Sequence, residues 1–191
     1  SEVQIAEPIV PPCEDWSTME KLAKEKEVVG IYISGHPLDD YKFEMKYFCN
    51  AKLESLKNLE QHLGKNLSFG GIVTNVQHRT AKNGKGWATF VLEGYDESYE
   101  FRIFDEEYLK YRHFLLQNQF VYFKINVKEG WVNRETGKKS DPRIQFLDAK
   151  MLADVLPTFA KKLFIHLDIK DLHSNFVTEL KELFAANTGD N

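Results

Sequence analysis

The spacing of apolar residues changes once along the chain, at Leu67, and this change restricts the possible folds more than any other feature. Before Leu67, apolar residues recur every three or four positions, which is typical of amphipathic helices. From Leu67 onward, apolar and polar residues alternate, which is typical of half-buried strands. This alternation predicts strands at 68–79, 87–93, 99–104, 119–128 and 143–152, and a short helix at 105–116 after the third strand.

The order of these elements favours one small fold. Three successive strands, a helix and two more strands are the elements of the OB-fold, a five-stranded Greek-key barrel that we expect to be closed. A five-stranded sandwich is the alternative, but it offers no natural place for the helix. Gly70-Gly71 lies inside the first strand, which indicates a bulge or a barrel corner rather than a phosphate-binding loop.

Short helices are predicted before the barrel. Ser17 and Glu20 form a capping-box pattern, which predicts a helix from Ser17 to about Ile33. The run Ser34-Gly35-His36-Pro37 should end it, and Pro37 can begin a second helix. A third helix is expected at 53–63.

The sequence therefore predicts a mixed α+β chain in four parts. These are an extended linker (1–16), a helical segment (17–66), the OB-fold domain (67–152) and a β-α tail (153–191) that begins a further domain. The tail has a strand-like alternation at 162–169, followed by an amphipathic helix that carries Phe176, Leu180 and Phe184 on one face.

Composition excludes several classes of protein. An apolar fraction of 42% and a charged fraction of 28% are ordinary for a globular domain and argue against wholesale disorder. We expect neither a membrane span nor a signal peptide. Cys13 and Cys49 are too few for a disulfide framework or a four-cysteine zinc site, so a reducing cytoplasm is the expected compartment.

The net charge of −4 conceals an uneven distribution of charge. Residues 65–150 carry 14 basic and 11 acidic side chains, whereas residues 1–64 carry 7 and 12. The positive part coincides with the predicted barrel. Because a polyanion responds to the local field, the acidic total does not exclude a nucleic-acid partner.

No pattern predicts a catalytic centre, a metal site or a cofactor. The acidic pairs Asp39-Asp40 and Glu106-Glu107 lie in the first turns of predicted helices, where the helix dipole favours carboxylates. The six histidines lack metal-ligand spacing. For His36 we expect a structural role between two helices, with a direct DNA contact as the alternative.

Basic and aromatic residues gather where OB-folds bind nucleic acid, on strands two and three and on the loops that join strands 1–2 and 4–5. Cations that contact phosphates and rings that stack on bases are the parts of a single-strand platform. The candidates are Arg79, Lys82, Lys85 and Trp87 around the first loop, Arg102 on strand three, Tyr122 and Lys124 on the expected outer face of strand four, and Lys128, Trp131, Arg134, Lys138 and Lys139 around the second loop. Solvated hairpin tips and a tryptophan packed at the barrel end are the alternatives.

Three runs of the sequence resemble one family. The runs MEKLAKEKEVVGIYISGHPLDDYK (19–42) and GIVTNVQHRTAKNGKGWATFVLEG (71–94) resemble the linker helix and the OB-domain opening of the bacterial DNA polymerase III alpha subunit. The tail run from Leu163 to Phe184 is similar to the start of the family's C-terminal domain, which binds the clamp-loader tau subunit. Nothing matches the family's catalytic aspartates, its phosphoesterase histidines or its clamp-binding peptide.

The resemblance implies a non-catalytic OB region of a DNA-directed DNA polymerase that binds single-stranded template during replication. The implied partners are single-stranded DNA, other polymerase domains and, through 158–191, the tau subunit. An architectural or protein-interaction module without DNA binding is the first alternative. An RNA-binding OB-fold, as in some tRNA synthetases, is the second, and the S-G-H-P-L run argues against it.

Overall fold

The computed structural model describes residues 15–132, 136–162, 164, 166–168, 170 and 172–187. The chain divides into two compact units, residues 1–40 and 41–191. The helical segment predicted at 17–66 is therefore shared between two units, and the four predicted domain boundaries stay predictions. Residues 1–14 of the predicted linker lie outside the described residues.

The first unit contains helix α1 (Thr18–Val29), which begins at the predicted capping box. Ser17 Oγ accepts a hydrogen bond from Glu20 N at 3.3 Å, and the Glu20 carboxylate accepts one from Ser17 N at 2.9 Å. The predicted end near Ile33 is wrong. Gly30 adopts φ +85° and ends the helix earlier as a left-handed cap, a conformation that costs glycine little.

The next helices are short and mostly of the 3₁₀ type. The helix predicted from Pro37 consists of the 3₁₀ helix η1 (Pro37–Tyr41) and the α-helix α2 (Lys42–Tyr47). The third predicted helix is the 3₁₀ helix η2 (Leu53–His62), which is interrupted by non-helical dihedral angles at Asn58. Both carboxylate oxygens of Glu97 accept hydrogen bonds at its start, from Leu53 N and Glu54 N at 2.9 Å each.

All five predicted barrel strands are confirmed, and they form one antiparallel sheet in the order β3-β2-β1-β4-β5. The strands are β1 (Asn66–Thr80), β2 (Gly86–Glu93), β3 (Ser98–Phe104), β4 (Phe120–Lys128) and β5 (Arg143–Met151). The helix predicted at 105–116 is α3 (Asp105–Tyr111) followed by the 3₁₀ turn η3 (Arg112–Phe114). The strand order is that of an OB-fold.

Strand β1 is long because it changes partner along its length. Residues 66–72 pair with β4, and residues 72–80 pair with β2. Gly70 and Gly71 lie at this change, which fits the predicted barrel corner. A Cβ on Gly71 would lie 2.6 Å from the Glu93 carbonyl oxygen, so the close approach of β2 requires glycine there.

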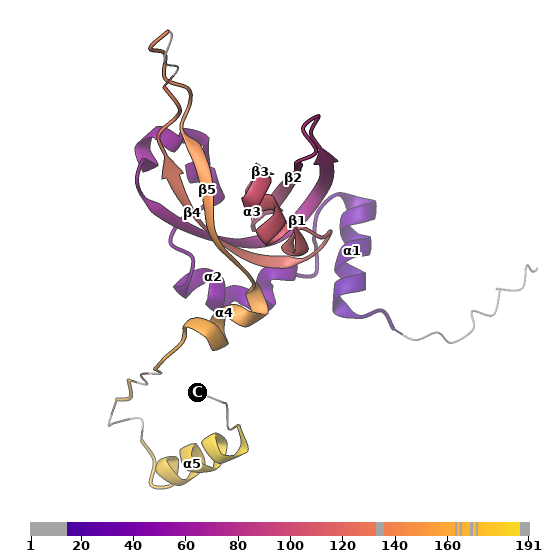
Figure 1. The fold of residues 1–191 in the computed structure, drawn as a ribbon. Coiled ribbons are helices and arrows are strands. Elements are labelled where there is room, and N and C mark those ends of the chain that lie inside the picture. Colours follow the sequence, from indigo (N-terminus) through magenta and orange to yellow (C-terminus); the bar gives the residue numbers. More distant parts are fainter. Residues whose placement is uncertain are drawn as a thin grey trace, which may run out of the picture. The chain divides into compact units, whose positions relative to one another are not determined.

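The expectation of a closed barrel is corrected, because β3 and β5 end the sheet without pairing with each other in the described part of the chain. They approach through the core, where the Phe101 and Phe146 ring centroids lie 5.7 Å apart. Side chains of helix α3 (labelled in Figure 1) supply hydrogen-bond partners to β5 instead. Glu107 Oε2 accepts from Phe146 N at 3.3 Å, and Tyr111 OH donates to Leu147 O at 2.6 Å.

The tail after the sheet contains helix α4 (Leu152–Phe159), which was not predicted, and helix α5 (Phe176–Ala186), which was. Pro157 is the sixth residue of α4, where it removes one backbone donor, and the helix ends two residues later. The strand expected at 162–169 falls partly outside the described residues, at 163, 165 and 169. Among the described residues, no helix is long and apolar enough to cross a membrane.

Candidate nucleic-acid interface

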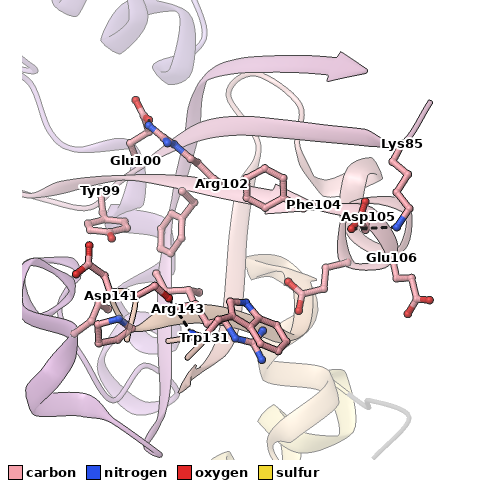
Figure 2. A pocket seen from close by; sticks show the side chains of 16 residues that line it. Lys85, Tyr99, Glu100, Arg102, Phe104, Asp105, Glu106, Trp131, Asp141 and Arg143 are labelled. Atoms are coloured by element: carbon pink, nitrogen blue, oxygen red, sulfur yellow. Dashed lines mark hydrogen bonds and ion pairs between the residues drawn. The ribbon is translucent and has the colours of Figure 1, made fainter. Parts of the chain in front are cut away.

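An open groove of about 890 Å³ lies where the sheet fails to close, between β3 and β5. Figure 2 shows Tyr99, Arg102 and Phe104 of β3 along one side, and Trp131, Asp141 and Arg143 along the other. The acidic start of α3 and Lys85 of the β1–β2 hairpin complete the lining. The groove therefore lies between the two loops that the sequence predicts to flank a bound strand.

Three side chains on adjacent strands form a ladder of stacked planar groups. The sheet register places Arg79 opposite Trp87 and Trp87 opposite Phe104, so all three point to the same face. The Arg79 guanidinium lies 5.4 Å from the Trp87 ring centroid, and the Trp87 and Phe104 rings stack at 5.6 Å with 19° between their planes. Phe104 is 50% exposed and lines the groove.

A second stacked pair lies on the opposite side. The Arg143 guanidinium lies 4.6 Å from the Trp131 ring centroid, and Trp131 is 71% exposed. Its backbone is anchored, because Trp131 N donates to Ser140 Oγ at 2.8 Å and Ser140 N donates to Trp131 O at 2.9 Å. The alternative in which Trp131 packs at the barrel end does not fit this exposure.

Most of the cations near the groove already have acidic partners. Lys85 Nζ lies 3.4 Å from Asp105, an Arg102 guanidinium nitrogen 3.6 Å from Glu100, and Lys139 Nζ 3.1 Å from Glu129. All of these side chains are about half exposed or more, so each pair is weak and screened by salt. A phosphate can compete for such cations.

Other predicted cations lie on the hairpins and outside the groove lining. Lys82, Lys128 and Lys138 are exposed, Lys82 at the tip of the β1–β2 hairpin and the other two around the β4–β5 loop. Arg134 lies outside the described residues. The two hairpins thus carry cations at their tips and aromatic rings at their bases.

The prediction that Tyr122 faces solvent is wrong. Tyr122 is 5% exposed because α4 packs over it, with the Phe159 ring centroid 5.6 Å away, and this burial raises the pKa of its phenol. Lys124 is exposed as predicted, but it lines a different hollow, beside Phe48 and Asp148. Strand alternation located the two faces of β4 but not the helix that covers one of them.

The structure adds Phe104 and gives His78 a structural role. His78 Nδ1 lies 3.2 Å from Tyr108 OH and Nε2 lies 3.2 Å from Leu115 O, so the ring links β1 to α3 and the segment after it. Phe104 lacks a distinctive motif. The alternation of β3 could have identified it, because Phe104 shares the face of Arg102 at the strand end.

The polar groups singled out for chemistry serve structural roles. Asp39 Oδ2 accepts from His36 N at 3.0 Å, and Leu38 N donates to His36 Nδ1 at 3.1 Å, which fits the predicted turn role of His36. Burial raises the pKa of the Cys49 thiol to about 12, which makes it a poor nucleophile. Within the described residues, no group of three or more His, Cys, Asp or Glu side chains could hold a metal ion.

No protein-family model matches this chain. Among curated proteins, the DNA polymerase III subunit alpha of Campylobacter jejuni is 30% identical over 181 residues, which are 90% of this chain and 14% of that protein. The corresponding protein of Saccharopolyspora erythraea is 29% identical over 123 residues, 63% of this chain and 10% of that protein. That of Borreliella burgdorferi is 34% identical over 108 residues, 56% of this chain and 9% of that protein.

This chain spans about a tenth of the length of the curated relatives it matches. The similarity reaches 90% of its own residues, so it covers more of the chain than the three runs that carry the resemblance in the sequence. The resemblance is therefore confirmed: the chain is similar, over most of its length, to a segment of the bacterial DNA polymerase III alpha subunit.

Proposed function

We propose that residues 67–152 bind single-stranded DNA in the groove between β3 and β5, as a non-catalytic OB module of a replicative DNA polymerase. One observation carries the proposal: the exposed rings of Phe104 and Trp131 line an open groove on a sheet with OB-fold strand order, and each ring belongs to a stack that includes a guanidinium. Aromatic faces stack on bases of any sequence, and flanking cations contact the phosphates.

The proposed role follows from the similarity to the polymerase subunit. The module would hold the template strand near a polymerase core supplied by other domains, and it would have no nucleotidyl-transfer activity itself. Nucleotidyl transfer uses carboxylates that converge on two metal ions, and the acidic pairs of this chain begin helices instead. Incorporation of nucleotide by the purified chain would contradict this part of the proposal.

A binding titration tests the main claim. Labelled single strands of about twelve nucleotides suit the site size of one OB-fold. We expect weak binding that prefers single-stranded over duplex DNA. Three or four phosphate contacts imply a slope of about −2 to −3 when the logarithm of the binding constant is plotted against that of the salt concentration. A slope near zero, or a preference for duplex, would refute the proposal.

A second candidate is a protein-interaction module, and the tail favours it. Helix α5 exposes the apolar side chains of Val177, Leu183 and Phe184. Exposed apolar residues along one helix are typical of a surface that a partner covers. We propose that residues 153–191 begin a domain that contacts the clamp-loader tau subunit, alongside DNA binding by the barrel. Pull-down of purified tau, compared with Leu183→Asp and Phe184→Asp variants, tests this role.

A further inference from the structure

The groove is acidic, although its surroundings are basic. Its lining contains three basic side chains and five acidic ones. Two of the three cations, Lys85 and Arg102, are paired with Asp105 and Glu100, and the third, Arg143, lies over the Trp131 ring. A phosphodiester pushed into this groove would meet a negative field, and carboxylates can only accept hydrogen bonds.

Cations that a phosphate could contact lie farther out, on the two hairpins. Lys82 and Lys138 are exposed and lie outside the groove lining. The flat faces of Phe104 and Trp131, by contrast, belong to the lining. This separation of rings from free cations indicates that a bound strand keeps its phosphates at the rim and turns its bases inward.

Asp141 is the lining carboxylate on the same side of the groove as Trp131 (Figure 2). It follows Ser140, whose hydroxyl and amide hold the Trp131 backbone, and so it shares the anchored base of the β4–β5 loop. A Cβ on Gly130 would lie 2.5 Å from Asp141 O, so the two sides of the loop are in close contact there. In the part of the chain that the structure describes, the Asp141 carboxylate has no hydrogen bond or ion pair.

A carboxylate distinguishes bases by their donors. A carboxylate accepts from the exocyclic amino group of cytosine, adenine or guanine. Thymine has no amino group: it carries a carbonyl oxygen where cytosine carries N4, and its N3–H donor lies between two carbonyl oxygens that repel a carboxylate. We infer that the groove binds bases with an exocyclic amino group in preference to thymine, and that Asp141 is a specificity-determining residue. This inference rests on the proposed binding of single-stranded DNA.

The test compares two strands of about twelve nucleotides, one of 5-methylcytosine and one of thymine, by fluorescence anisotropy. The two bases share the methyl group and the ring size, so they differ at the amino group and the adjacent ring nitrogen. One good carboxylate–amine contact predicts about fivefold tighter binding or more for 5-methylcytosine. Equal binding, or tighter binding of thymine, would overturn the inference, and failure of both strands to bind would refute the proposed function itself.

Two variants identify the side chain responsible. Asp141→Asn should bring the ratio of the two affinities close to one, because an amide can donate to the thymine oxygen as well as accept. Glu129→Gln is the matched control: it removes one negative charge near the same loop, from a residue outside the groove lining that pairs with Lys139. It should tighten both strands alike and keep the ratio. An unchanged ratio in Asp141→Asn would refute the assignment to Asp141.

Discussion

Replacing Trp131 by alanine separates base stacking from barrel packing. A stacked ring is worth about 1–3 kcal/mol per base, so we expect the dissociation constant for single-stranded DNA to rise about 5- to 150-fold. Because the ring carries no charge, the salt dependence of binding should stay nearly unchanged. Anisotropy titrations at several salt concentrations measure both quantities.

The exposure of Trp131 determines the expected cost in stability. A fully buried tryptophan would lose about 3–5 kcal/mol of folding free energy on truncation. Trp131 is 71% exposed, and its ring contacts the guanidinium of Arg143, which lies 4.6 Å from the ring centroid. Such an exposed contact contributes about 0.5–1 kcal/mol, so the melting temperature should fall by only about 2–4 °C.

Tyr47→Ala is a matched control for the tryptophan variant. Tyr47 is also an exposed ring beside a cation, with Lys46 Nζ 5.1 Å from its centroid, but it lies on α2 and outside the groove lining. It should bind DNA as the parent does. If Trp131→Ala folds normally and binds as tightly as the parent, the stacking role is refuted. If both variants lose affinity equally, the groove is not the site.

Three further perturbations have definite expected results. Lys82→Ala should lower the salt slope of DNA binding by about 0.7. Lys85→Ala should lower the slope less, because Asp105 already neutralises Lys85. Titrations in which the two variants have equal slopes would contradict this difference. Gly71→Ala should reduce the unfolding free energy by about 1–3 kcal/mol in denaturant melts, since its Cβ would lie 2.6 Å from a backbone oxygen. Burial raises the pKa of Glu107 above 4.5, so the folded protein binds this proton more tightly and loses stability as the pH rises above about 4.5. Glu107→Gln should remove that loss of stability. If the unfolding free energies of variant and parent change equally with pH from about pH 4 to 7, the role of Glu107 is refuted.

The strands of the barrel were predictable because a half-buried strand requires alternation and a turn requires particular residues. Asn83-Gly84 indicated the β1–β2 hairpin, and Gly84 adopts φ +80° there. Local signals also located the start of α1, where Ser17 and Glu20 satisfy free backbone groups within one turn. The end of α1 was misplaced because Gly30, Gly35 and Pro37 all qualify as stop signals in sequence.

The candidate site was predictable as a set of residue types on two loops, but not as a groove. The sequence predicts Arg79 and Trp87 around the first loop and Arg102 on strand three, yet only the register shows that Trp87 stacks between Arg79 and Phe104. Tyr122 was misjudged because the covering helix α4 packs from a part of the chain without a clear helical signal.

The sequence by itself determined the order of the elements and the residue types at the hairpins, since both depend on periodicity and turn chemistry within a few residues. The tertiary structure alone decided whether the barrel closes. Closure depends on whether β3 or α3 supplies partners to β5, which is a competition between segments about forty residues apart. Glu107 and Tyr111 bond to β5, and the open seam that results is the groove. The acidic character of that groove is likewise tertiary, because its carboxylates come from β3, α3 and the β4–β5 loop, and no sequence window contains them together.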